Sequence, residues 1–287
     1  MMNIQEAVAK AQRVLTEAGV ESARVTAELL LAHVLQWERV RVLAHALDPI
    51  DADAHERFRE LVRQRSKGEP LQYLTGKQEF CGHIFNVTPA VLIPRPETEL
   101  LVESALCLAK KAGRERLLFL DVGAGSGCIA VSFALGCPQA SGCAIDVSAG
   151  ALAIARENAA RHGVLDHIRF ICGDFIECVA RRPQFDFILS NPPYVAAANA
   201  ASLPATVRDY EPRVALFGGE SGMHAYHRIV PAAAERLLPG GYLLMEIGAG
   251  MSQMVADLVR KYPFAVESIL EDLQSIPRCL VARRDHG

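Results

Sequence analysis

Apolar positions recur at helical spacing through the first quarter of the chain. Between residues 3 and 68 they fall every three to four positions, and no alternating strand pattern interrupts them. Ser22, and then Asp51 or Asp53, stand where N-cap residues would begin successive helices. This pattern predicts a small all-helical domain over residues 1–75.

The pattern changes over residues 76–96. Two short apolar stretches, 79–80 and 84–87, flank the turn residues 81–83, which is typical of a hairpin. Two prolines follow shortly afterwards, and they hold the backbone in an extended conformation. We therefore predict a β-hairpin and extended linker between two domains.

Strand and helix patterns alternate over residues 97–287. A helical pattern opens this part at 97–111, and later helices are predicted at 151–159, 224–238 and 251–262. Apolar runs predict strands at 117–120, 141–145, 168–172, 185–190 and 242–247, with a final pair near 266–270 and 278–282. This alternation predicts an α/β fold with a Rossmann-like, doubly wound and mainly parallel sheet.

Composition and charge narrow the class of protein. Of the 287 residues, 51% are hydrophobic and only 6% aromatic, which suits a helix-rich protein around a buried parallel sheet. The net charge is −3 and no block of Lys or Arg occurs, so we expect no direct nucleic-acid partner. No signal peptide or membrane-spanning apolar run is present, so we predict a cytoplasmic protein without a membrane partner. None of the eight cysteines forms a C-x-x-C pair, which favours reduced thiols and no metal site.

A glycine-rich turn, Asp121-Val122-Gly123-Ala124-Gly125-Ser126-Gly127, directly follows the first predicted strand of the α/β domain. Its glycines let the backbone turn tightly and approach a ligand, although a plain strand-to-helix turn has the same composition. The spacing is G-x-G-x-G and not the G-x-G-x-x-G of dinucleotide sites. Asp121 would repel a pyrophosphate but suits the positive end of a methionine-type ligand. The predicted cofactor-binding residues of this turn are Asp121, Gly123, Ala124, Gly125, Ser126 and Gly127.

Acidic residues also end the next two predicted strands. Asp146 lies about 20 residues past the glycine turn, where a carboxylate can accept hydrogen bonds from both ribose hydroxyls of a nucleoside. An N-cap role for Asp146 is the alternative, and Ser148 competes for that role. Asp174 can accept from an adenine amino group, and the ring of Phe175 can cover the base.

The tetrapeptide Asn191-Pro192-Pro193-Tyr194 follows the fourth predicted strand and is the most specific motif of the chain. An amide or aryl amine nitrogen delocalises its lone pair, so it becomes nucleophilic only when acceptors hold both N–H groups. Asn191 offers a side-chain carbonyl and Pro192 a backbone carbonyl, while the prolines keep both rigid. Tyr194 supplies an aromatic wall for a planar group. We predict that Asn191, Pro192, Pro193 and Tyr194 form the catalytic and substrate-binding motif.

Together these features resemble the class I amino methyltransferases, which modify glutamine, adenine or cytosine nitrogens. Further segments are similar to the release factor glutamine methyltransferases, and the resemblance covers essentially the whole chain, including the helical domain. These segments are Glu69–Gly76, Glu79-Phe80, Leu92–Glu99, Tyr210-Glu211-Pro212, Glu220-Ser221-Gly222 and Gly240-Gly241 before the strand to Glu246. Phe175 stands where the family also has tryptophan, and Ile247 where histidine is often seen.

The resemblance implies methyl transfer from S-adenosylmethionine, without a metal, to the glutamine amide N5 in the Gly-Gly-Gln motif of bacterial peptide chain release factors. Such methylation modulates translation termination. By the family pattern, 123–127, Asp146, Phe175 and Asn191 match cofactor positions, and 191–194 match the glutamine site. The helical domain and Pro94–Glu99, with Arg95 and Glu97, are expected to hold the protein substrate, and the enzyme is expected to be a monomer.

Three alternatives stay open at this level. An N6-adenine or other amino-group methyltransferase acting on nucleic acid uses the same tetrapeptide, but it needs a basic channel and a pocket for a flipped base. A scaffold that has lost activity would not need Asn191 and its prolines. A nicotinamide dehydrogenase would bind NAD and not S-adenosylhomocysteine.

Overall fold

The computed structural model of the chain describes residues 2–286, whose contacts divide into two compact units. The first, the helical unit, contains the chain up to Lys77 together with Pro204–Tyr210. The second, the sheet unit, contains Gln78–Leu203 and the chain from Glu211 onward. The contribution of Pro204–Tyr210 to the helical unit was not predicted, because nothing in that segment's own pattern indicates which partner it packs against.

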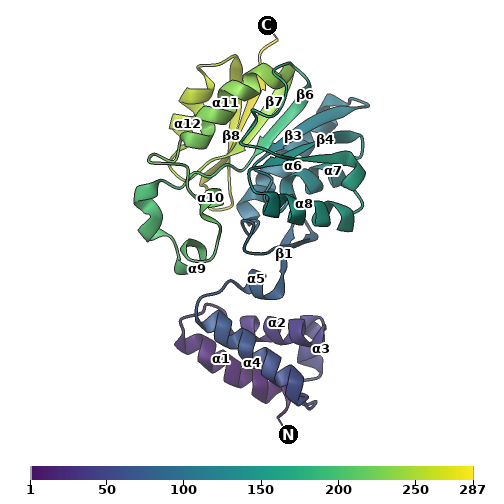
Figure 1. Cartoon of the computed structure of the whole chain (residues 1–287), viewed down its shortest axis with the longest axis vertical. Coiled ribbons are helices and arrows are strands. Elements are labelled where there is room, and N and C mark those ends of the chain that lie inside the picture. The colour runs from purple at the N-terminus through teal and green to yellow at the C-terminus, as the bar shows by residue number, and fades with distance from the viewer. Residues whose placement is uncertain (1, 287) are drawn as a thin grey trace. The chain divides into compact units, whose positions relative to one another are not determined.

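The helical unit is built from short amphipathic helices around one apolar core (Figure 1). Its helices are α1 (Ile4–Glu17), α2 (Ala23–Leu35), α3 (Arg39–Ala44), α4 (Ala52–Ser66), α5 (Leu71–Thr75) and α9 (Ala205–Arg208). Leu15, Leu30 and Phe58 are fully buried in this core, and each comes from a different long helix. The predicted all-helical N-terminal domain is therefore confirmed.

The helix starts show which capping predictions hold. The Asp51 side chain accepts a hydrogen bond from the backbone N–H of Ala54 at 2.8 Å and so caps α4. Ser22 precedes α2 but adopts a left-handed conformation, with φ of 50°, and its side chain makes no capping bond. Ser22 is therefore the N-cap residue of α2, as predicted, but it makes no capping bond, because such a bond requires extended backbone at its own position.

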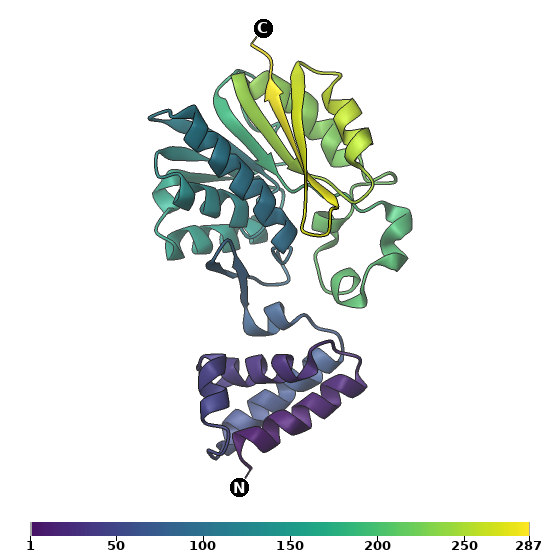
Figure 2. The same ribbon diagram turned by 180° about the vertical axis from the view of Figure 1, so that it is seen from behind.

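The large sheet of the sheet unit contains seven strands in the order β5-β4-β3-β6-β7-β9-β8, and Figure 2 shows this sheet from the side opposite to that of Figure 1. The strands are β3 (Leu117–Val122), β4 (Ala140–Asp146), β5 (Ile168–Cys172), β6 (Phe185–Ser190), β7 (Leu237–Glu246), β8 (Phe264–Glu271) and β9 (Pro277–Arg284). The first five run parallel, while β9 is antiparallel to both β7 and β8. The predicted mainly parallel, doubly wound sheet is confirmed. The hairpin β1 (Lys77–Phe80) and β2 (His83–Asn86) forms a separate two-stranded sheet.

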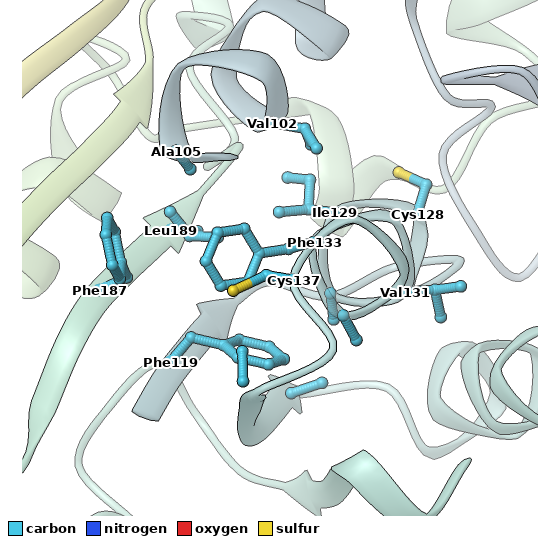
Figure 3. Close-up of a cluster of buried hydrophobic side chains, with 14 of the residues drawn as sticks. Val102, Ala105, Phe119, Cys128, Ile129, Val131, Phe133, Cys137, Phe187 and Leu189 are labelled. Carbon is cyan, nitrogen blue, oxygen red and sulfur yellow. The ribbon is translucent and has the colours of Figure 1, made fainter. Parts of the chain in front are cut away.

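Helices cover both faces of the large sheet. On one face lie α6 (Pro96–Ala112), α7 (Cys128–Gly136) and α8 (Ala149–Arg161); on the other lie α11 (His224–Arg236) and α12 (Ser252–Val259). Figure 3 shows Phe133 of α7 inserted between Phe119, Phe187 and Leu189 of the sheet. Burial on both faces explains why the parallel strands appear in the sequence as continuous apolar runs.

Two segments differ from the sequence-based expectation. Strand β7 begins at Leu237 and not at 242, because a bulge beside Phe185 lets the Pro-Gly-Gly segment continue the strand. Residues 197–216 form the short helices η2 (Ala197–Ser202), α9 and α10 (Arg213–Leu216), which are too short to leave a periodic pattern. Across residues 2–286, no helix is long and apolar enough to span a bilayer.

Candidate active site

A cavity of about 310 Å³ lies at the edge of the sheet where the parallel strands end. Ligands of open α/β sheets bind at this edge, since the loops that leave neighbouring strands converge there. The cavity is lined by Leu92, Pro94, Arg95, Thr98, Gly123, Ala124, Gly125, Ser126, Cys128, Ile129, Ile145, Asp146, Val147, Gly173, Asp174, Phe175, Asn191, Pro193, Val214, Ala215, Phe217 and His224. It therefore joins the glycine turn, the two acidic strand ends and the Asn-Pro-Pro-Tyr motif in one space.

The glycine turn adopts a backbone that only glycine enters freely. Gly123, Gly125 and Gly127 all have positive φ, at 79°, 54° and 79°. A Cβ on Gly127 would also meet the Cβ of Ala155 at 3.0 Å, so α7 and α8 approach each other through this position. The turn is held from below by Asn158, whose buried side-chain amide donates to the carbonyl of Ser126 at 2.8 Å.

Asp146 ends β4 beside the turn. Its carboxylate accepts from the N–H of Gly125 at 2.8 Å and from the N–H of Ser148 at 2.8 Å. The N-cap bond of α8 comes instead from the hydroxyl of Ser148, which accepts from Ala151. Asp146 therefore does not cap α8, and it lines the cavity, while its ribose-binding role stays a prediction.

Asp121 lies beneath the turn and does not line the cavity. It is completely buried, and one carboxylate oxygen accepts from the N–H of Ala130 at 3.1 Å. The other oxygen, Oδ1, has no hydrogen-bond partner among the described residues. Burial, opposed by the Ala130 N–H and reinforced by the charge of Asp146, raises the pKa of Asp121 to about 7. Oδ1 of Asp121 is therefore a buried acceptor without a donor beneath the turn.

The loop after β5 closes another side of the cavity. Phe175 adopts a positive φ of 49°, an uncommon conformation for an aromatic residue and one that tends to persist where the surroundings enforce it. The guanidinium of Arg228, from α11, lies 5.0 Å from the centre of the Phe175 ring and pairs with Asp174 and Glu177. His224 lies on the same side, with its ring 6.1 Å from that of Phe175.

The Asn-Pro-Pro-Tyr motif crosses directly over the glycine turn. A Cβ on Gly123 would lie 3.9 Å from the backbone carbonyl of Asn191, so the two loops are in contact. A buried hydrogen bond from the Ser190 hydroxyl to the carbonyl of Val122, at 2.6 Å, ties the ends of β6 and β3 together. On the far side the motif packs against glycines, because a Cβ on Gly218 would meet the Pro193 carbonyl at 2.4 Å. These contacts leave the motif little freedom to move.

The side chains of the motif join a buried polar network. The Nδ2 group of Asn191 donates to the hydroxyl of Thr98 at 3.0 Å, and that hydroxyl donates to Glu246 Oε2 at 2.5 Å. The Tyr194 hydroxyl donates to the other oxygen of Glu246 at 3.3 Å, and Tyr226 donates to the Glu246 backbone carbonyl at 2.9 Å. The tyrosines therefore act through Glu246, behind the cavity, and not at its wall.

Titration of this network is shifted by its burial. Burial raises the pKa of Glu246 to about 7, against the hydrogen bonds from Thr98 and Tyr194, which favour the ionised form. Burial, together with the charge of Glu246, raises the pKa of the Tyr194 hydroxyl above its usual range. Tyr194 is therefore a neutral donor at physiological pH.

Arg95 lies at the mouth of the cavity and is held there by an ion pair. Its guanidinium contacts Glu211 at 2.5 Å, and the nearly fully buried Glu211 also accepts from the N–H of Ile93 at 3.3 Å. Because Glu211 anchors both the extended segment and its arginine, the guanidinium is partly neutralised and oriented before any ligand arrives.

The sequence of this chain is similar to that of known proteins over most of its length. A release factor glutamine methyltransferase of Koribacter versatilis is 41% identical over 283 residues, covering 99% of both chains. Another, from Bordetella pertussis, is 44% identical over 255 residues and covers 89% of this chain and 93% of that protein. The chain belongs to the release factor glutamine methyltransferase family.

The two domains have separate family matches. Residues 6–76 match the PrmC N-terminal domain, and residues 97–207 match the methyltransferase small domain. Among solved structures, a methyltransferase from Pyrococcus furiosus has a TM-score of 0.51 at 18% identity, covering 70% of this chain and 88% of that one. At that identity the likeness shows the fold alone.

Within this glutamine methyltransferase, most of the predicted site residues lie together. The predicted residues that line the cavity are Gly123, Ala124, Gly125, Ser126, Asp146, Asp174, Phe175, Asn191, Pro193 and Arg95. Five others do not line it. Asp121 and Gly127 are buried under the turn, Pro192 is buried within the motif, Tyr194 contacts Glu246, and Glu97 lies half-buried on α6.

Sequence reasoning missed several residues of the site. The sequence gives Thr98 only as part of a family segment and Glu246 only as the end of a strand. The position of Glu246 could have indicated a site residue, since it ends a parallel strand at the same edge as Asp146 and Ser190. No local sequence pattern indicates Arg228 or His224 as site residues, because each contacts Phe175 only once α11 has packed against the loop after β5.

Proposed function

We propose that this chain transfers a methyl group from S-adenosylmethionine to the side-chain amide nitrogen of a glutamine in bacterial peptide chain release factors. One observation carries the proposal: a single cavity joins the glycine turn to the Asn191 side chain, with the two loops in contact at Gly123. Family membership over the full chain supports the same reaction and the same substrate.

The residues on the glycine side fit this cofactor. The positive-φ turn lets backbone approach a ligand closely, and the carboxylate of Asp146 can accept from the ribose hydroxyls. The partnerless oxygen of Asp121 suits the positively charged end of the methionine moiety, through the turn above it. Phe175 would cover the adenine ring of the cofactor, and Asp174 would accept from its amino group, since both residues line the cavity. When bound, the cofactor supplies a methyl group already activated on a sulfonium.

The protein's own contribution is orientation of the glutamine amide. In this proposal Asn191 Oδ1 accepts a hydrogen bond from one amide N–H. The backbone carbonyl of Pro192, which lies between the lining residues Asn191 and Pro193, accepts from the other, and this turns the nitrogen lone pair out of conjugation with its carbonyl. Within residues 2–286 neither oxygen is engaged as an acceptor by another residue. The nitrogen held in this way would accept the methyl group that the bound cofactor supplies, and the cofactor would leave as S-adenosylhomocysteine. The nitrogen then loses a proton to solvent, so no strong base is required.

The rest of the chain serves the protein substrate in this proposal. The helical unit and the segment around Arg95 and Glu97 hold the release factor while its glutamine loop enters the cavity. We infer that the enzyme acts as a monomer in the cytoplasm, where translation ends, without binding nucleic acid or metal itself.

Mass spectrometry of a release factor after incubation with the protein and S-adenosylmethionine tests the proposal. We expect a gain of one methyl group on the glutamine of its Gly-Gly-Gln motif. A release factor with that glutamine replaced by alanine is the matched control and stays unmodified. DNA and RNA are incubated in parallel with labelled cofactor. Label entering only the nucleic acid would refute the substrate assignment in favour of an adenine-type methyltransferase.

A further inference from the structure

The Asn191 side chain has two ends of opposite polarity, and its role requires one of them to face the substrate. An amide presents a carbonyl acceptor on one side and an NH2 donor on the other, with nearly the same shape. An N–H donor on the substrate needs the carbonyl. A flipped Asn191 would present its own NH2 and repel the group that it must hold. The site therefore needs a device that distinguishes the two orientations.

Thr98 is placed to be that device. A hydroxyl carries only one hydrogen, and a carboxylate accepts but does not donate. The 2.5 Å contact with Glu246 Oε2 takes the hydrogen of the Thr98 hydroxyl, leaving its oxygen only lone pairs to offer Asn191 at 3.0 Å. Asn191 must then turn its NH2 toward Thr98 and its carbonyl away from it.

Other hydrogen bonds hold Glu246 in position as an acceptor for the Thr98 hydroxyl. Its second oxygen accepts from Tyr194, its own backbone carbonyl accepts from Tyr226, and both Glu246 and Thr98 are 2% exposed. Water, which can donate or accept and would erase the discrimination, has little access to either group. Thr98 lies on α6 and Glu246 on β7, so the polarity reaches Asn191 from two elements distant in sequence.

We infer that Thr98, with its hydroxyl directed by the Glu246 carboxylate, is a positioning residue that locks the Asn191 amide with its carbonyl toward the substrate. This lock makes the site select a carboxamide over a carboxylate. The inference rests on the proposed function. It extends that function by assigning the selection between glutamine and glutamate to a residue that lines the cavity and accepts a hydrogen bond from Asn191.

The first test is methyl transfer to a release factor by Thr98→Val, in which a methyl group replaces the hydroxyl at nearly constant volume. We expect kcat to fall at least about tenfold, as for the loss of a hydrogen bond that fixes a reacting group. Affinity for S-adenosylhomocysteine should stay within about threefold. Thr98→Ser, which keeps the hydroxyl, is the matched control and should retain kcat within about threefold of wild type.

The second test measures which end of the Asn191 amide faces the substrate, and a merely structural role of Thr98 would not change its result. A release factor carrying glutamate in place of the Gly-Gly-Gln glutamine competes against the unmodified one. We expect wild type and Thr98→Ser to exclude it. Thr98→Val lets Asn191 present its NH2, so inhibition by the glutamate form should strengthen by about tenfold, an effect of one regained hydrogen bond.

The third readout is the pH profile of kcat/KM. Thr98 donates a hydrogen bond to Glu246, and the charged and titratable groups around that carboxyl are Glu97 on α6, Tyr194 after β6, Tyr226 on α11, and Arg278 and Cys279 on β9. Below the pKa of Glu246, which is about 7, the carboxyl group gains a hydrogen and no longer dictates the direction of the Thr98 hydroxyl. Wild type should lose activity on that acid side, while Thr98→Val should show no such limb.

The outcomes separate the two proposals. If the wild-type protein methylates no release factor, the proposed function fails and the lock fails with it. If wild type is active and Thr98→Val keeps its kcat and still excludes the glutamate form, only the lock is refuted. Equal losses in Thr98→Ser and Thr98→Val also refute it, because shape and not the hydroxyl would then matter. Thr98→Ala, which deletes the same hydroxyl, takes the place of Thr98→Val in every arm if the valine variant does not fold.

Discussion

The two sides of the cavity are built on different principles. The cofactor side consists of 123–127, Asp146 and 173–175, and each of these segments ends or directly follows one strand of the sheet. The amide side consists of 191–194 backed by Thr98 and Glu246, so its polar contacts cross between three elements. A close backbone approach can be encoded within seven consecutive residues. The orientation of one side-chain amide requires partners that only the completed fold brings together.

The largest expected effect comes from removing the amide side at its centre. Asn191→Ala takes away one of the two proposed acceptors, and we expect turnover to fall by about a hundredfold or more, since positioning terms are commonly that large. Affinity for S-adenosylhomocysteine, measured by calorimetry, should fall much less. If turnover stays near that of the wild type, the amide side does not orient the substrate, and the proposed difference in role between the two sides is refuted.

A smaller effect of the opposite kind is expected on the cofactor side. Asp146→Ala removes the carboxylate that faces the cavity and supports Gly125, so cofactor affinity should fall by about tenfold to a hundredfold. Turnover at saturating S-adenosylmethionine should fall far less than in Asn191→Ala. The matched control is Asp166→Ala, which removes an exposed carboxylate outside the cavity and should leave affinity unchanged. Equal losses of turnover in Asp146→Ala and Asn191→Ala would show that the two sides are not separable.

The smallest effect is expected on the stability of the ligand-free protein, through the buried carboxylate of Asp121 beneath the glycine turn. The folded-state pKa of Asp121, about 7, lies above its ordinary value of 3.8. A raised pKa of this kind favours folding at low pH, and that contribution is lost as the pH rises from about 4 through 7. From pH 5.5 to 8, wild type should therefore lose about 1–2 kcal/mol more unfolding free energy than Asp121→Asn.

Urea denaturation at the two pH values measures this difference. Asp166→Asn, which neutralises an exposed carboxylate, serves as the control and should follow wild type. Glu246 has a raised pKa of the same sign, so Asp121→Asn should keep part of the slope. If the slope is identical in wild type and Asp121→Asn, then Asp121 does not titrate in this range.

These differences also explain what could be predicted from the sequence. Apolar runs such as 187–189 in β6 predicted the parallel strands, because burial on both faces of the sheet removes the alternation of apolar and polar residues. The glycine turn and the Asn-Pro-Pro-Tyr motif could be located because their chemistry lies in adjacent residues. The Thr98–Glu246 contact spans 148 positions, and no local pattern encodes such a pair. The helices in 197–216 could not be predicted for a different reason, since helices of four to six residues complete too few turns to show a period.

The segment Pro204–Tyr210 has one more consequence, for how the protein can be divided. The chain leaves the motif at Tyr194, contributes α9 to the helical unit, and returns to Glu211 in the sheet unit. Within the helical unit, the hydroxyl of Tyr210 donates to the carbonyl of Lys67 at 3.0 Å. No single cut can therefore release either unit whole. A fragment that starts at residue 97 would carry α9 and Tyr210 stripped of their packing partners, and a fragment that ends at residue 77 would lack one of its own helices.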